Sequence, residues 1–251
     1  MTATIVIAGK GGTGKTSIAA LLIQTLSKKG VVLAIDADPA TNLNQALGVE
    51  AGGTVGRIRE EMTQAIQSGT LSPSVSKHDY LEGQIRAALV ESKGFDLLAI
   101  GRPEGPGCYC AANNMLRMSI DKLGRNYRYV VVDSEAGMEH ISRQTTRDVD
   151  VLVIVSDPTQ RSIRTAAAIK DLIGEMRTRV GRIALVVNRS PNGLPPEIAQ
   201  AAKSYSFENL LTIGQDPNLA SLEIKGRPTT ELPADSPLRL GVSELVARLE
   251  L

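Results

Sequence analysis

Short runs dominated by valine, isoleucine, leucine and alanine recur along the chain and constrain its fold more than any other feature. The six runs span residues 4–8, 31–35, 96–100, 129–133, 151–155 and 183–187. Continuous apolar runs are typical of strands that helices cover on both faces. Segments with helical spacing lie between them; in residues 16–30, one face carries Ile18, Leu21, Leu22 and Leu26. This alternation predicts an α/β fold with a mostly parallel central sheet flanked by helices on both faces.

Residues 48–94 interrupt the alternation. The interval is polar and helical in character, and we interpret it as a helical insertion between two strands. The sequence shows no internal repeat, low-complexity tract or linker, and 251 residues fit one large domain. We therefore expect a single domain over residues 1–251.

Charge and hydropathy restrict the class of partner. Lysine and arginine total 28 against 27 for aspartate and glutamate, so no net field attracts nucleic acid or an anionic membrane. No apolar run approaches the length of a membrane-spanning helix, and residues 1–12 resemble neither a secretory signal nor a transit peptide. The amphipathic segment at residues 236–251 is interpreted as a helix packed on the domain. We expect a cytoplasmic protein without a nucleic-acid or membrane partner.

The first apolar run leads into GKGGTGKT, residues 9–16, and a helical segment follows. Strand, glycine-rich loop and helix in this order form a P-loop, in which backbone N–H groups and the helix N-terminus bind phosphates. Lys15 is expected on the β and γ phosphates of ATP, and Thr16 on Mg²⁺. The candidate nucleotide-binding residues of this loop are Gly9, Lys10, Gly11, Gly12, Thr13, Gly14, Lys15, Thr16 and Ser17. They indicate a P-loop NTPase.

A second lysine of the loop, Lys10, is not required by an ordinary P-loop. Its placement resembles the deviant Walker A loop of the family that includes the septum-site ATPase MinD, the ParA partition ATPases and the nitrogenase iron protein. In that family this lysine reaches the nucleotide of the partner subunit, so the resemblance implies a homodimer with ATP between two chains. Lys10, Lys15 and Asp38 would then be the catalytic residues. A solvated surface lysine is the alternative.

Aspartates follow two of the predicted strands. Asp36 and Asp38 stand at the end of the second run, where parallel sheets bind ligands, and Asp133 ends the fourth run. By the same resemblance, Asp38 would orient the attacking water and Asp36 would support the Mg²⁺ shell. Asp133 would hold Mg²⁺ through water, and Gly137 would pivot towards the γ phosphate. An acidic helix cap is the alternative for one of the aspartates.

Asn188 follows the sixth run. Its place matches the residue with which this family reads the adenine edge, and residues 214–217 could complete that pocket. Asparagine after a strand is also a common turn residue, so both base contacts have a simpler alternative.

The only two cysteines of the chain, Cys108 and Cys110, stand two residues apart. In an extended segment residues i and i+2 point to the same side, so the two sulfurs can converge as half of a tetrahedral thiolate site for Ni²⁺ or Zn²⁺. A second copy of the chain, related by two-fold symmetry, would supply the other half. Two inert, buried thiols are the alternative.

The segments GRPEGPGCYCAANN, DADPATNLN and DSEAGMEHISRQTTRDVD together resemble the CooC-type ATPases, which help to install nickel in carbon monoxide dehydrogenase. The resemblance implies a homodimeric ATPase that binds Ni²⁺ or Zn²⁺ between its subunits and delivers nickel to carbon monoxide dehydrogenase or a related nickel enzyme. Two alternatives stay open: an iron–sulfur cluster carrier or reductase of the same superfamily, and a spatial organiser of the ParA or MinD type.

Overall fold

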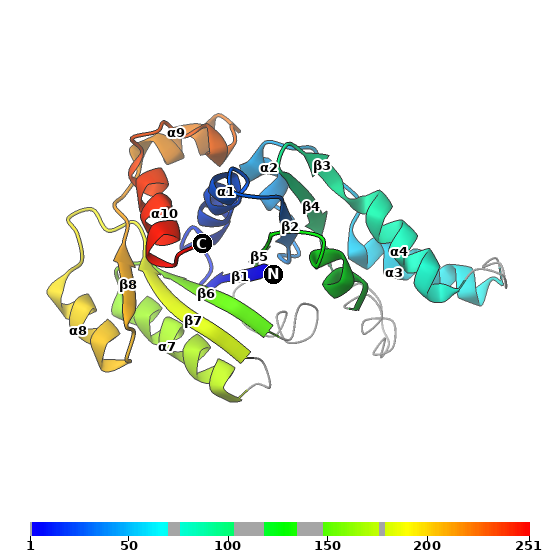
Figure 1. Cartoon of the computed structure of the whole chain (residues 1–251). Coiled ribbons are helices and arrows are strands. Elements are labelled where there is room, and N and C mark those ends of the chain that lie inside the picture. Colours follow the sequence, from blue (N-terminus) through cyan, green and yellow to red (C-terminus); the bar gives the residue numbers. More distant parts are fainter. Residues whose placement is uncertain (1, 70–75, 103–117, 135–147, 176–178) are drawn as a thin grey trace.

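The computed structural model describes residues 2–69, 76–102, 118–134, 148–175 and 179–251, and its centre is one eight-stranded sheet (Figure 1). The strand order is β3-β4-β2-β5-β1-β6-β7-β8. The strands are β1 (Ala3–Gly9), β2 (Val32–Asp36), β3 (Val90–Ser92), β4 (Phe95–Ala99), β5 (Tyr129–Asp133), β6 (Asp148–Ser156), β7 (Arg179–Val187) and β8 (Asn209–Thr212). Every pairing is parallel except that between β3 and β4. The predicted mostly parallel sheet is confirmed.

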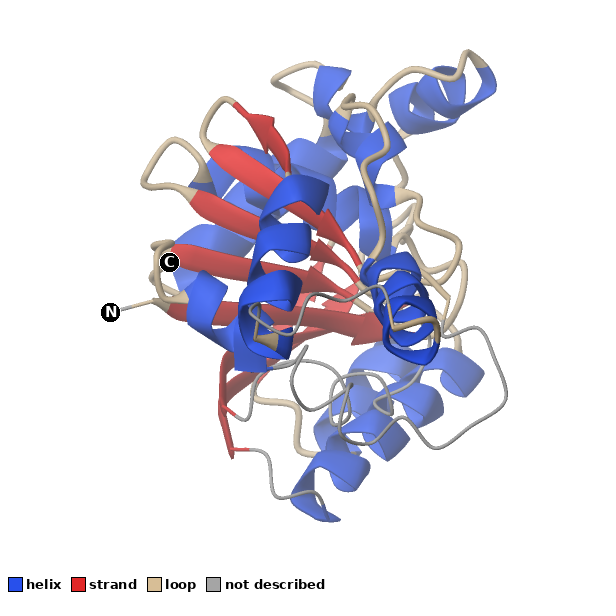
Figure 2. Cartoon of the chain, turned by 90° about the vertical axis from the view of Figure 1, so that its right-hand side faces the viewer, coloured by secondary structure: helices blue, strands red, loops and turns tan. Residues whose placement is uncertain are grey.

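Helices cover both faces of the sheet (Figure 2). One hydrophobic cluster joins a sheet face to α1 (Lys15–Leu26), α2 (Leu43–Leu47), α9 (Pro217–Ile224) and α10 (Pro237–Arg248). The other cluster joins the opposite face to α3 (Val55–Gln67), α4 (Lys77–Ala88), a helix at residues 118–124, α7 (Gln160–Glu175) and α8 (Pro196–Ser204). A 3-10 turn, η1 (Thr229–Glu231), precedes α10. Neighbouring residues of β1 alternate between the clusters, which is why its sequence is continuously apolar.

The C-terminal amphipathic segment packs on the domain, as predicted. Its apolar residues Leu238, Val242, Leu245, Val246 and Leu249 are all buried. Ser236 caps α10, because its hydroxyl accepts a hydrogen bond from the backbone N–H of Arg239. Within the residues described, no helix combines the length and the hydropathy needed to cross a membrane.

Helices α3 and α4 occupy most of the interval 48–94, between β2 and β4. Thr54 and Ser76 cap the two helices with their hydroxyl oxygens. The interval also contains β3, an antiparallel edge strand of three residues that the apolar runs do not predict. The opposite edge strand, β8, is likewise short and half-buried, so it too lacks the continuous apolar pattern.

Candidate nucleotide-binding site

The glycine-rich loop lies at the centre of the carboxyl edge of the sheet, because β1 is paired with both β5 and β6. Gly9 ends β1 with φ 144°, and a Cβ atom there would stand 2.1 Å from the carbonyl oxygen of Val155 on β6. Gly12 and Gly14 also have positive φ values, of 79° and 92°. These positions require glycine, and they let the loop curl in front of α1.

The N-terminus of α1 is open for an anion. Its N-cap residue, Gly14, offers no side chain, so the first N–H groups of the helix are not capped by it. The hydroxyl of Thr13 donates to the carbonyl oxygen of Lys10 at 2.9 Å and thereby closes the loop on itself. Backbone N–H groups at a helix N-terminus and the positive end of the helix dipole favour an anion, so this place suits the predicted phosphate site, which stays a prediction.

Lys15 is buried under this loop, and its ammonium donates to the carbonyl oxygen of Lys10 at 3.3 Å. A buried ammonium beside a ring of N–H groups makes the site strongly electropositive. Lys10 lies differently: its ammonium is 3.6 Å from a carboxylate oxygen of Asp157, and its side chain is 37% exposed. In the single chain, the lysine that was predicted to act across a dimer contacts its own subunit.

Asp133, at the end of β5, is the residue in this region whose environment most demands a cation. It is 1% exposed, and within the described residues neither of its carboxylate oxygens has a hydrogen-bond partner of normal geometry. Burial raises the pKa of Asp133 to about 7, and the nearby charges of Asp36 and Asp38 add to the shift, whereas the Thr16 hydroxyl and the Lys15 ammonium act against it.

This environment fits Mg²⁺. Carboxylate and hydroxyl oxygens are the ligands that this ion prefers, and it keeps several of its waters when it is bound with a nucleotide. A divalent cation beside Thr16 would also remove the electrostatic cost of the buried Asp133 charge. The predicted roles of Thr16 and Asp133 stay predictions, but the structure brings the two residues together.

Asp36 holds the backbone after β2 through two hydrogen bonds. One oxygen of its buried carboxylate accepts the backbone N–H of Asp38 at 3.1 Å, and the other accepts that of Leu43 at 2.9 Å. The side chain therefore holds the loop after β2 and anchors the start of α2. Burial raises the pKa of Asp36 to about 6, and the two hydrogen bonds oppose this rise. Its support of the Mg²⁺ shell remains a prediction.

Asp38 lies within the loop that Asp36 holds. One of its oxygens accepts the backbone N–H of Ala40 at 2.8 Å, and Thr41 adopts the left-handed region at φ 47°. Register places Asp36 directly beside Asp133 on the neighbouring strands β2 and β5. The predicted carboxylates thus meet at one point of the sheet edge, facing the P-loop.

Asn188 packs against the P-loop rather than standing apart from it. Its side-chain amide donates to the carbonyl oxygen of Thr13 at 2.8 Å, and a Cβ atom on Gly14 would come within 2.6 Å of that amide nitrogen. Asn188 also lines a cavity of about 250 Å³. The cavity is bounded further by Arg189, Gly214, Gln215, Asp216, Leu219, Ala220, Glu223 and Leu238. The loop at residues 214–217 therefore does lie beside Asn188; a contact of either with adenine stays a prediction.

Arg189 is not among the residues named from the sequence, and Asp216 is named there only as part of the loop at residues 214–217. Arg189 has φ 59°, and its guanidinium donates to the carbonyl oxygen of Gly12 at 2.9 Å. Asp216 accepts the backbone N–H of Leu238 at 3.3 Å and a hydrogen bond from the Ser236 hydroxyl, so it ties the cavity wall to α10. Arg189 could have been noticed as a basic residue directly after Asn188. The contacts of Asp216 with Ser236 and Leu238 have no local sequence signal.

The predicted cysteine site lies outside the described residues, since Cys108 and Cys110 fall in residues 103–117 and Gly137 in residues 135–147. Among the residues that are described, no group of three or more histidine, cysteine, aspartate or glutamate side chains is arranged to hold a metal ion.

A P-loop at the centre of a parallel sheet, with aspartates at the ends of β2 and β5, defines a P-loop nucleotide-binding protein. The CobQ/CobB/MinD/ParA nucleotide-binding domain family matches residues 4–229, and the chain belongs to that family. An uncharacterised ATP-binding protein of Methanocaldococcus jannaschii is 42% identical over 250 residues, which cover 98% of this chain and 97% of that protein. The carbon monoxide dehydrogenase accessory protein CooC of Rhodospirillum rubrum is 37% identical over 188 residues, covering 68% of this chain and 69% of that protein.

Solved structures share the fold. One is the septum site-determining protein MinD of Pyrococcus horikoshii OT3, complexed with Mg-ADP. Its superposition on this chain gives a TM-score of 0.69 at 20% identity, and the aligned part covers 100% of this chain and 96% of the MinD chain. A ParA family ATPase from Chlorobium tepidum TLS has a TM-score of 0.71 at 19% identity, covering 98% of both chains.

Proposed function

We propose that this protein is an ATPase that works as a homodimer and delivers nickel to carbon monoxide dehydrogenase or a related nickel enzyme. The observation that carries the nucleotide part is the buried carboxylate of Asp133, which lies beside Thr16 and the P-loop lysine Lys15 and has no hydrogen bond of normal geometry among the described residues. Burial makes the charged form of this carboxylate costly, and a bound cation would offset that cost. Binding of Mg²⁺ with a nucleotide supplies that cation.

The reaction is attack of water on the γ phosphorus of ATP, which breaks the bond to the β–γ bridging oxygen and gives ADP and phosphate. Phosphoryl transfer depends on positioning and on neutralisation of charge. Lys15 and the N–H groups of the loop neutralise the phosphates, and Thr16 and Asp133 would hold a Mg²⁺ ion that would supply further positive charge. Asp38 accepts a hydrogen bond from the attacking water, and Asp36 keeps the Asp38 loop in place through its two backbone contacts.

The dimer part of the proposal rests on Lys10 and on the family. Within the described residues, its ammonium forms one ion pair, a partly exposed contact to Asp157 that is worth about 0–1 kcal/mol, so Lys10 can leave that contact at little cost. In the dimer Lys10 would move to the nucleotide of the partner subunit and add a cation to the charge that develops on the transferred phosphate.

The nickel part rests on the similarity to CooC and on the sequence Cys108-Tyr109-Cys110. Two thiolates per chain complete a tetrahedral site only across a two-fold axis. ATP and metal would then stabilise the same dimer, and each would strengthen binding of the other by linkage. Loss of the γ phosphate would weaken the dimer and release the metal to the client enzyme. The metal is the cargo of this cycle.

A role as a membrane-bound spatial organiser is less well supported. Such a role needs an apolar helix face that is free to enter a membrane, and the apolar face of α10 is buried against the sheet.

The test is a measurement of molecular mass in solution with a slowly hydrolysed ATP analogue, with and without Ni²⁺ or Zn²⁺. The wild-type chain should dimerise most strongly with both ligands, and bound metal should approach one ion for two chains. Cys108→Ser/Cys110→Ser should keep the response to nucleotide and lose the response to metal. If this double variant still dimerises when metal is added, the shared thiolate site is wrong. Lys10→Ala should lose the response to nucleotide while still binding metal.

A further inference from the structure

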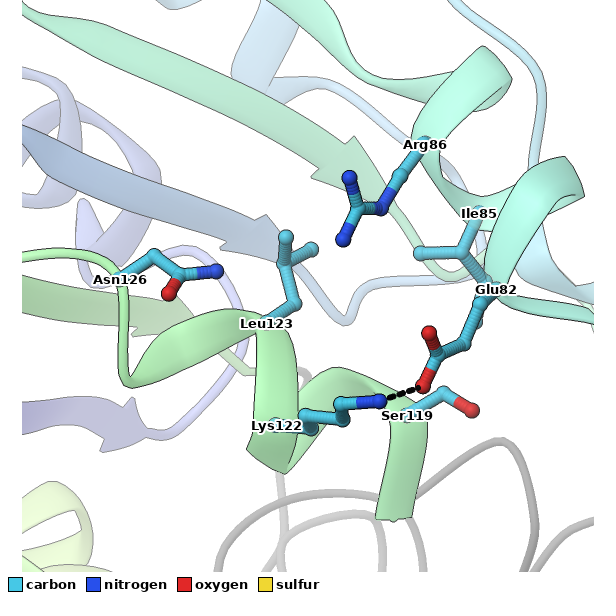
Figure 3. Close-up of a pocket in the computed structure, with 7 residues that line it drawn as sticks. All are labelled: Glu82, Ile85, Arg86, Ser119, Lys122, Leu123 and Asn126. Carbon is cyan, nitrogen blue, oxygen red and sulfur yellow. Dashed lines mark hydrogen bonds and ion pairs between the residues drawn. The ribbon is translucent and has the colours of Figure 1, made fainter. Parts of the chain in front are cut away.

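A second cavity lies between α4 and the helix at residues 118–124 (Figure 3). Its volume is about 180 Å³, which is room for several water-sized groups. It is lined by Glu82, Ile85, Arg86, Ser119, Lys122, Leu123 and Asn126. None of these residues belongs to the P-loop, to the aspartates at the sheet edge or to the cavity beside Asn188.

The cavity is lined by two basic side chains and one acidic side chain. The ammonium of Lys122 is 2.6 Å from a carboxylate oxygen of Glu82, so these two side chains neutralise each other. The side chain of Arg86 has no ion pair or hydrogen bond to any residue in the described part of the chain. It is close enough to Tyr127, whose hydroxyl donates to Asp96, to affect the pKa of that phenol. In Figure 3 its guanidinium extends from α4 into the space between the two helices. Of the charged residues that line the cavity, Arg86 is the one without an ion-pair partner among the described residues.

Two neutral hydrogen-bonding groups accompany Arg86. Ser119 is 3% exposed, and its hydroxyl has no hydrogen-bond partner within the described residues. A buried hydroxyl in this condition loses the free energy of its hydrogen bonds to water, and a polar group bound in the cavity would restore it. Asn126 lies at the far side of the cavity, with its carboxamide turned towards Leu123 and the space that Arg86 enters (Figure 3). The side chains of Ile85 and Leu123 add an apolar wall.

We propose that this cavity is a binding site for a small carboxylate. A planar guanidinium donates two parallel N–H bonds to a carboxylate, which is the geometry that a fixed arginine recognises best. The Ser119 hydroxyl and the Asn126 amide supply further donors, and Ile85 and Leu123 accommodate a short aliphatic stem. The cavity is too small for a nucleotide, and its single net charge suits a carboxylate better than a multiply charged phosphate chain.

A ligand in this cavity would contact a helix that lies between the cysteine segment and β5 in the sequence. The helix at residues 118–124 follows directly in sequence after residues 103–117, which contain Cys108 and Cys110, and it leads into β5 and Asp133. A carboxylate bound by Arg86 of α4 and by Asn126, which closely follows the helix at residues 118–124, would join this helix to α4 (Figure 3). The same chemistry can come from a free metabolite or from an acidic side chain of another protein.

The site is tested with two probes: free succinate, and a short peptide that carries glutamate. Binding is followed by the backbone amide shifts of Ser119 and Asn126 in the full chain saturated with Mg-ADP, so that the P-loop is occupied. We expect at least one probe to shift both amides and to saturate. Arg86→Gln should weaken binding by about tenfold or more, and Ser119→Ala by about threefold.

The matched control is Arg57→Gln, because Arg57 is an exposed arginine of α3 that pairs with Glu61 away from the cavity. This variant should bind like the wild type. Saturation by succinate identifies a free small molecule as the source, and saturation by the peptide alone identifies a protein. The proposal is overturned when neither probe shifts the two amides, or when Arg86→Gln and Arg57→Gln bind equally well.

Discussion

The ammonium of Lys10 lies 3.6 Å from a carboxylate oxygen of Asp157, the residue that follows β6. Asp157 is held in place from α7, because its backbone N–H donates to the Ser162 hydroxyl at 3.1 Å. The contact keeps Lys10 over its own subunit. Under the proposed dimer mechanism, it competes with the contact that Lys10 makes to the partner's nucleotide.

Asp157→Asn should therefore favour the ATP-bound dimer. The substitution removes the charge that holds Lys10 in its own chain and retains the shape of the side chain. Because the ion pair is exposed and worth at most about 1 kcal/mol, the dimer dissociation constant should fall by about two- to fivefold. Analytical ultracentrifugation with an ATP analogue measures this constant. A weaker dimer would mean that Asp157 instead orients Lys10 for its contact in the dimer.

Asp133→Asn should stabilise the nucleotide-free protein and impair its function. The wild-type carboxylate is buried without a hydrogen bond of normal geometry among the described residues, and burial disfavours its charged form. The neutral amide should raise Tm by a few degrees and abolish the gain in nucleotide affinity that Mg²⁺ produces. Calorimetry with and without Mg²⁺ measures both effects.

Asp36→Asn is the matched comparison for that variant. Asp36 is equally buried, but its two oxygens accept backbone N–H groups of Asp38 and Leu43. An amide replaces one acceptor with a donor that faces an N–H group. The Asp36 variant should therefore lower Tm, and an increase like that of Asp133→Asn would show that the two hydrogen bonds contribute little.

The stability of the nucleotide-free protein should fall as pH rises towards neutrality. The pKa of Asp133 is about 7 in the folded chain against an ordinary value of 3.8, and that of Asp36 is about 6. Between these values the folded state binds more protons than the unfolded state, so the free energy of unfolding decreases with increasing pH and levels off above about pH 7. Urea titrations across this range measure the slope. Asp133→Asn should remove most of it, and Mg-ADP should do the same.

The central strands could be predicted because a strand that is buried on both faces has a continuously apolar sequence. The core strands β1, β2, β4, β5, β6 and β7 contain the six apolar runs, and the spacing of Leu238, Val242 and Leu245 correctly predicted a packed α10. The edge strands β3 and β8 are short and half-exposed, so their residues carry no comparable pattern.

The location of the P-loop could be predicted from a local motif, whereas the residues that contact it from other strands could not. The loop from Gly9 to Thr16 is a motif of consecutive residues, so it can be located from the sequence alone. Asp157 and Arg189 reach that loop only because β6 and β7 follow β1 in the sheet, with the register that brings their ends beside it. No spacing in the sequence encodes this register.

The role of Asn188 can be separated into loop support and base recognition. Asn188→Ala removes the amide that donates to the carbonyl oxygen of Thr13, which should cost about 1–2 kcal/mol of stability and weaken phosphate binding. Affinities for ATP, GTP and pyrophosphate distinguish the two roles. Equal losses for all three ligands indicate loop support alone, and a greater loss for ATP indicates that Asn188 also reads adenine.

Two glycines of the same loop should respond differently to alanine. A Cβ atom on Gly9 would stand 2.1 Å from the backbone carbonyl of Val155, so β1 could not keep its pairing with β6. Gly9→Ala should therefore cost about 3 kcal/mol or more of stability, or prevent folding. A Cβ atom on Gly11 meets nothing within 4 Å, and Gly11→Ala should change stability by less than about 0.5 kcal/mol. Chemical denaturation of the two variants measures the difference. Similar stabilities would contradict the packing of the P-loop against β6, whereas a stable Gly11→Ala protein with weakened nucleotide binding would show that this face of the loop contacts the phosphates.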